Sequence, residues 1–191
     1  MTTGIAEKLY TVEEYFDFEK KSETRHEFYY GELIPMPGES TTANEIASNI
    51  LVFFKLFLKG KPFKVYEHDI KLMVKDQKVY RYPDLFVIHQ KGNHKTYTTD
   101  PILIVEVISD STENTDRERK RVQYFSIPTL QYYLLVHQDE SIVEFYTREN
   151  SHWIYDYRSD LNDTIALPFF ETSISLSTIY DGITLEKENQ D

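Results

Sequence analysis

The 191-residue sequence contains no cysteine, and this absence excludes several kinds of site. Disulfide bonds, thiolate zinc sites and a cysteine nucleophile all require a thiol. Glycine is also scarce, with six residues, and no glycine-rich loop of the kind that binds nucleotide phosphates occurs. The six histidines are scattered without the spacing of a zinc site. The sequence therefore argues against a cysteine-dependent enzyme, a zinc site and a glycine-rich phosphate-binding loop.

Long apolar runs are absent too. No stretch approaches the roughly 18 apolar residues of a membrane-spanning helix, and the first residues lack the basic and apolar segments of an export signal. We therefore expect a soluble, cytoplasmic protein. Its length predicts a single domain over residues 1–185, followed by a polar tail at residues 186–191.

Positive charge is in short supply. The net charge is −11 at pH 7, which is poorly suited to sequence-independent binding of nucleic acid, because that binding depends on neutralising phosphate groups. A role with nucleic acid would therefore need a local basic patch or a metal ion.

Hydrophobic periodicity divides the chain into helices and strands. Thr11 and Glu14 have the spacing of a capping box, as do Thr115 and Glu118. The pattern predicts helices at 12–20, 42–59 and 115–125, a hairpin at 25–37 that turns at Gly31, and strands at 65–74, 79–89, 101–108, 130–137, 142–146 and 153–157. This order indicates an α/β fold with a sheet of mixed direction.

The strand at 101–108 carries the most informative residue. Its sequence, PILIVEVI, is apolar apart from Glu106, which predicts a central strand covered on both faces. Burial of an unpaired carboxylate costs several kcal/mol or raises its pKa. Glu106 therefore requires a cation, a proton or an opening at the edge of the sheet.

A second carboxylate, Asp84, follows Pro83 on the preceding predicted strand. Neighbouring strands can bring Asp84 and Glu106 together, and a shared divalent cation is the natural way to hold both ionised. The position two residues after Glu106 is Ile108, so a catalytic cation must come from elsewhere.

The predicted helix at 115–125 can supply that cation. Arg117, Lys120, Arg121 and Tyr124 fall on one side of the helical wheel, and the angles alone do not separate Lys120 from Arg121. A compact ammonium group is better suited to orienting a water molecule and stabilising a phosphorane, which favours Lys120.

Each residue also has a structural interpretation. Asp84 could form a turn at a strand end, Glu106 could pair with Arg81 or Arg117, and the basic helix could be a solvated face. Glu27 and Asp69, on early strands, could be outer-shell acids or ordinary surface carboxylates.

Taken together, Pro83-Asp84, Glu106-Val107-Ile108 and the helix with Lys120 and Tyr124 resemble the PD-(D/E)XK restriction-endonuclease-like superfamily with a migrated lysine. More closely, the chain is similar to an endonuclease family written Uma-two, through segments that include HEFYYGELIPMPG, YPDLFVI and ILIVEVISDST. One departure is the lack of a histidine between Ser40 and Ile50, near the start of the second helix.

The resemblance implies a restriction-endonuclease-like central mixed β-sheet flanked by helices. It implies Asp84 and Glu106 as ligands of Mg²⁺ or Mn²⁺, Lys120 as the catalytic cation, and hydrolysis of DNA phosphodiester bonds. The alternative is a catalytically silent module of the same fold that binds DNA or protein, which the net charge of −11 favours.

Nucleases of this fold often pair, so a homodimer is a further expectation. Tyrosines on the later strands could form its interface, although a half-exposed sheet face would have the same composition. These tyrosines are Tyr132, Tyr133, Tyr146, Tyr155 and Tyr157.

Overall fold

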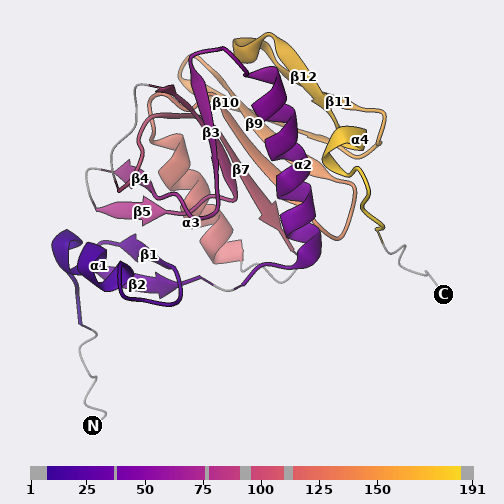
Figure 1. Ribbon diagram of the computed structural model, residues 1–191. Coiled ribbons are helices and arrows are strands. Elements are labelled where there is room, and N and C mark those ends of the chain that lie inside the picture. Colours follow the sequence, from indigo (N-terminus) through magenta and orange to yellow (C-terminus); the bar gives the residue numbers. More distant parts are fainter. Residues whose placement is uncertain (1–7, 37, 76–77, 91–95, 110–113, 186–191) are drawn as a thin grey trace.

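The computed structural model describes residues 8–36, 38–75, 78–90, 96–109 and 114–185; for residues 75 and 114–116 it describes the backbone alone. Within these ranges the chain forms a six-stranded sheet, a four-stranded sheet and a β-hairpin, together with helices (Figure 1). The predicted polar tail at 186–191 lies outside the described residues, so the prediction of one domain and a tail stays a prediction.

The six-stranded sheet is the centre of the molecule. Its order is β10 (His152–Arg158), β9 (Val143–Glu149), β8 (Tyr132–His137), β7 (Pro101–Ile108), β6 (Leu85–His89) and β3 (Phe63–Glu67). Neighbouring strands are antiparallel except β7 and β8, which are parallel. The sheet is therefore mixed, as predicted, and the run from Pro101 to Ile108 is a central strand.

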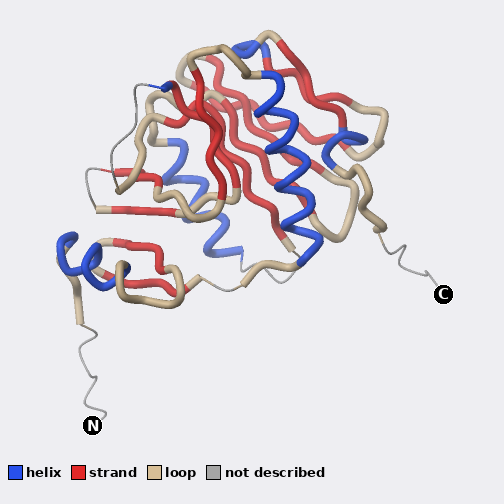
Figure 2. Tube along the Cα trace, in the orientation of Figure 1, coloured by secondary structure: helices blue, strands red, loops and turns tan. Residues whose placement is uncertain are grey.

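Helices cover both faces of this sheet (Figure 2). On one face α2 (Thr41–Phe57) packs with the hairpin β11 (Thr164–Leu167) and β12 (Thr172–Ser175), with the short 3₁₀ helix η2 (Pro168–Phe170) and with α4 (Leu176–Ile179). The other face packs against α3 (Asn114–Phe125) and part of the four-stranded sheet. α3 is the crossover that parallel β7 and β8 require.

The four-stranded sheet has the order β2 (Glu32–Pro35), β1 (His26–Tyr29), β5 (Val79–Arg81) and β4 (Leu72–Lys75). The β1–β2 hairpin turns through Tyr30 and Gly31, both at positive φ, as a two-residue hairpin turn demands. Helix α1 (Val12–Glu19) packs on this sheet, and its predicted capping box is present: Thr11 and Glu14 each accept a hydrogen bond from the other's backbone N–H.

Two predicted strands are wrong in an informative way. The run 65–74 divides into β3 and β4, separated by a turn in which His68 has φ +40°, and the run 79–89 divides into β5 and β6. The second break falls at Pro83, which has no N–H to donate to a ladder. Each run leaves one sheet and enters the other, so Asp84 lies at the junction between the two sheets.

The predicted helices are present with small shifts at their ends. α2 begins at Thr41 and ends at Phe57, before Gly60 at φ +81°. α3 runs from Asn114 to Phe125, and the Thr115 side chain of the predicted capping box lies outside the described part. None of the described helices is long and apolar enough to cross a membrane.

Candidate active site

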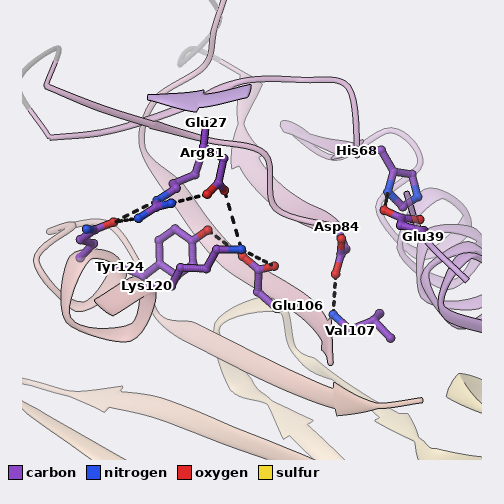
Figure 3. Close-up of polar contacts among 10 residues, drawn as sticks. Glu27, Glu39, His68, Arg81, Asp84, Glu106, Val107, Lys120 and Tyr124 are labelled. Carbon is purple, nitrogen blue, oxygen red and sulfur yellow. Dashed lines mark hydrogen bonds and ion pairs between the residues drawn. The ribbon is translucent and has the colours of Figure 1, made fainter. Parts of the chain in front are cut away.

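A cavity of about 570 Å³ opens where the four-stranded sheet meets the C-terminal end of β7 and the helix α3. Carboxylates and cations from distant parts of the sequence line it (Figure 3). The charged lining residues are Glu27, Glu39, Asp84, Glu106, Arg117 and Lys120. The cavity therefore brings together all three residues that the sequence predicts as the site.

The pairing of three strands explains how the site is assembled. In β3 and β6, Glu67 is paired with Leu85, and the next backbone pair joins the His68 N–H to the Asp84 carbonyl at 3.3 Å. In β6 and β7, Leu85 is paired with Val105, so one step further places Asp84 opposite Glu106. Asp84 and Glu106 thus lie side by side on the face that α3 covers, and His68 lies next to Asp84 in the turn after β3.

Asp84 is held by the neighbouring strand. Its Oδ2 accepts a hydrogen bond of 2.6 Å from the Val107 N–H. Burial raises the pKa of Asp84 to about 8, and the nearby charge of Glu106 acts in the same direction, while the Val107 N–H and Lys120 oppose them. The Val107 N–H and Lys120 therefore offset only part of the effect of burial on this carboxyl group.

Glu106 is 7% exposed and has two partners. The Tyr124 hydroxyl donates a hydrogen bond of 2.7 Å to Oε1, and the Lys120 ammonium lies 3.6 Å from Oε2. Burial raises the pKa of Glu106, and Lys120 and Tyr124 oppose the shift. Of the two arginines in the structural alternative, Arg81 pairs with Glu27 while its charge also acts to lower the pKa of Glu106, and Arg117 pairs with Glu144.

Lys120 lies between two carboxylates, because its Nζ is also 3.7 Å from Oε1 of Glu27. Arg121, which the helical wheel could not separate from Lys120, faces another way: it pairs with Glu118 and donates to the Tyr146 hydroxyl at 3.2 Å. The structure thus places the ammonium group, and not the guanidinium group, beside Glu106.

Behind Lys120 lies a buried ion pair. Arg81 is fully buried and pairs with Glu27, and it donates two hydrogen bonds, of 3.0 and 2.9 Å, to the Gln123 side-chain carbonyl on α3. This contact fixes Glu27 in the wall of the cavity, next to Lys120, so the position of Glu27 suits an outer-shell acid. Asp69, the other candidate, is an exposed partner of Arg25 and does not line the cavity.

Two residues of the site were not among the sequence candidates: Glu39 and His68. Glu39 precedes the N-cap residue of α2, and its Oε1 lies 2.7 Å from Nδ1 of His68, whose pKa it raises. One donor atom each from Glu39, His68 and Asp84 lie within 4.8 Å of one another. The β3–β6 register would have indicated that His68 lies beside Asp84. The sequence pattern predicts one unbroken strand at 65–74 and therefore does not predict this register.

A divalent cation fits this set of side chains. Asp84 and Glu106 are neighbouring carboxyl groups whose pKa values are raised by burial. The pKa of Glu39 is lowered, mainly by its contact with His68 and to a lesser extent by a contact with Asp84. Close carboxylates of this kind bind either a proton or a metal ion. Oxygen donors suit Mg²⁺ and Mn²⁺, and an imidazole suits transition metals.

Comparison with known proteins identifies the family to which the chain belongs. A family model, Uma2, described as "Putative restriction endonuclease", matches residues 12–178. The chain belongs to the Uma2 family. The uncharacterized protein sll1609 of Synechocystis is 32% identical over 145 residues, which cover 74% of this chain and 82% of that protein. The uncharacterized protein slr1290 of the same organism is 30% identical over 175 residues, covering 90% and 91%.

A solved structure extends the comparison to the fold. The crystal structure of a "putative nuclease belonging to DUF820" from Anabaena variabilis matches with a TM-score of 0.72 and covers 89% of this chain and 97% of that chain. The two sequences are 15% identical, so the match concerns the fold alone. This Uma2 protein thus has the restriction-endonuclease-like architecture that its sequence resembles.

The buried pair behind the cavity predicts a large effect on stability. Replacement Arg81→Met should lower the free energy of unfolding by about 3–5 kcal/mol, because it leaves Glu27 buried with only the more distant Lys120. Arg25→Met, which removes an exposed ion pair with Asp69, should cost less than about 1 kcal/mol. Urea denaturation of both variants measures the difference, and equal losses would contradict a structural role for the buried pair.

Proposed function

We propose that this Uma2 protein is a metal-dependent endonuclease that hydrolyses DNA phosphodiester bonds. The observation that supports it best is the convergence of Asp84, Glu106 and Lys120 on one cavity, although they come from three different elements. Membership of a family described as restriction endonucleases gives independent support. Asp84 and Glu106 are the proposed ligands of Mg²⁺ or Mn²⁺, and Lys120 is the proposed catalytic cation.

The chain's own groups have distinct roles in this proposal. The Tyr124 hydroxyl and the Lys120 ammonium orient the Glu106 carboxylate, and the Val107 N–H orients that of Asp84. A bound dication would polarise a phosphoryl oxygen and lower the pKa of the attacking water. Hydrolysis forms a bond from the water oxygen to phosphorus and breaks the bond to one sugar oxygen, which takes up a proton. The Lys120 ammonium stabilises the negative charge that develops on the phosphate.

The acids give the first test of the proposal. Asp84→Asn and Glu106→Gln should each abolish Mg²⁺-dependent nicking of a plasmid and weaken Mg²⁺ binding in calorimetry, because each removes a charged oxygen ligand. Asp69→Asn is the matched control, since it removes an exposed carboxylate outside the cavity. Folded wild-type protein that binds DNA equally with and without Mg²⁺, and never cuts it, would support the alternative of a catalytically silent module.

Lys120 and Arg121 allow a paired test on adjacent residues. Both replacements with alanine remove one positive charge from α3, but only Lys120 lines the cavity. Lys120→Ala should lower the rate of cleavage at saturating DNA by about 10²–10³-fold. Arg121→Ala should leave that rate within about threefold. A common loss in both variants, removed by raising the DNA concentration, would mean that the helix contributes binding charge and no catalytic group.

The homodimer and the cytoplasmic location stay predictions. Tyr132, Tyr133 and Tyr146 are buried within the chain, which leaves Tyr155 and Tyr157 on the edge strand β10 as the exposed tyrosines of the expected interface. Light scattering should give twice the 22.7 kDa mass of the monomer. Tyr157→Glu should then reduce it to the monomer mass, because charge is unfavourable in the core of an interface. A monomer mass for the wild type would contradict the dimer.

A further inference from the structure

Glu39 and His68 reach Asp84 from two elements that carry no other part of the proposed catalytic set. Glu39 lies directly before α2, and His68 lies in the turn after β3. The backbone pair between His68 and Asp84 fixes the two residues side by side. Figure 3 shows Glu39 and His68 in contact on the far side of Asp84 from Lys120 and Glu106.

The state of the His68 ring points to a ligand. Both ring nitrogens are enclosed by neighbouring atoms, and within the described part of the chain Nε2 has no hydrogen-bond partner, while Nδ1 has only the ion pair with Glu39. A half-buried imidazole that served only as a charged surface group would be expected to donate from both nitrogens. The unsatisfied nitrogen instead suits a metal ion.

The size of the cluster agrees. Donor atoms that each lie about 2.1 Å from one ion are at most about 4.2 Å apart. The donors of Glu39, His68 and Asp84 lie within 4.8 Å of one another, close to this limit, so binding of one ion would require the three side chains to move closer together. Side-chain rotation alone can supply such a shift. Without an ion, the carboxylate and the imidazole pair with each other, as they do here.

We propose that Glu39, His68 and Asp84 bind a first-row transition-metal dication in preference to Mg²⁺. Mg²⁺ prefers oxygen ligands and keeps several waters, whereas an imidazole adds affinity for transition metals. Asp84 belongs to both this set and the proposed pair with Glu106. The inference deepens the proposed function, because it names the class of the cation. It rests on that function only through the shared residue Asp84.

Manganese is the probe, since bound Mn²⁺ is detected by electron paramagnetic resonance. Titration of the full-length protein should give bound Mn²⁺ whose pulsed spectrum shows coupling to a ¹⁴N nucleus, the signature of a bound imidazole. His68→Asn should remove this coupling and weaken Mn²⁺ binding by at least tenfold, with a change of less than about threefold for Mg²⁺. Asparagine is chosen because it tolerates the positive φ of this position.

His137 provides the matched control. It forms the same kind of half-buried pair, with its Nε2 2.9 Å from Glu144, but it does not belong to the described donor cluster around Asp84. His137→Asn should keep the nitrogen coupling and the Mn²⁺ affinity. Glu39→Gln is the second variant, and it should weaken Mn²⁺ binding at least tenfold while the nitrogen coupling remains at saturation.

Three results would overturn the inference: no Mn²⁺ binding by the folded protein, bound Mn²⁺ without nitrogen coupling, or coupling that survives in His68→Asn. Plasmid cleavage, measured in the same samples, separates the two proposals. Cleavage in Mn²⁺ without nitrogen coupling would leave the nuclease standing and remove the His68 site. Nitrogen coupling without cleavage would support the His68 site and contradict the proposed nuclease.

Discussion

The structure depends on burying carboxylates beside a limited number of cations. Glu27, Glu106 and Asp84 lie where two sheets and α3 meet, a position where an unpaired negative charge is costly. Arg81 compensates Glu27, and Lys120 is shared between Glu27 and Glu106. Burial and the nearby Glu106 raise the pKa of Asp84, and the Val107 N–H and the charge of Lys120 oppose this shift. The acid that is least compensated by the protein is therefore the one that both proposed metal sets share.

The connection from β7 through α3 to β8 makes this arrangement possible. Parallel strands need a crossover, and here the crossover helix passes over the carboxylate of the strand that precedes it. Lys120 and Tyr124 are one helical turn apart, so both reach Glu106 from above. The same helix extends Gln123 toward Arg81 in the four-stranded sheet. One helix thus connects the two sheets and supplies the cation of the site.

Local signals account for what the sequence could predict. A glutamate inside an apolar strand is conspicuous because burial is costly, and the preference for Lys120 over Arg121 came from chemistry when the helical wheel could not decide. Glu39 and His68 could not be found this way, since each is unremarkable in its own segment. The β3–β6 register places His68 beside Asp84, and this register cannot be read from the sequence. The alternation of apolar and polar residues over 65–74 continues without a break through the turn that separates β3 from β4, so it does not reveal that turn. The sequence shows that Pro83 has no backbone N–H to donate. It does not show that the chain passes from one sheet to the other at this residue.

The negative charge of the chain affects phosphate binding both through the whole molecule and through the carboxylates of the cavity. A net charge of −11 and a cavity lined by four carboxylates both oppose the approach of a phosphate. Burial raises the pKa values of two of these carboxyl groups, Asp84 and Glu106, which favours their uncharged forms. A dication bound by the ionised pair would balance its two negative charges and would concentrate a double positive charge at one point that a phosphate oxygen can approach. In the proposed nuclease, a bound dication would therefore supply the local positive charge for phosphate binding that the acidic chain lacks.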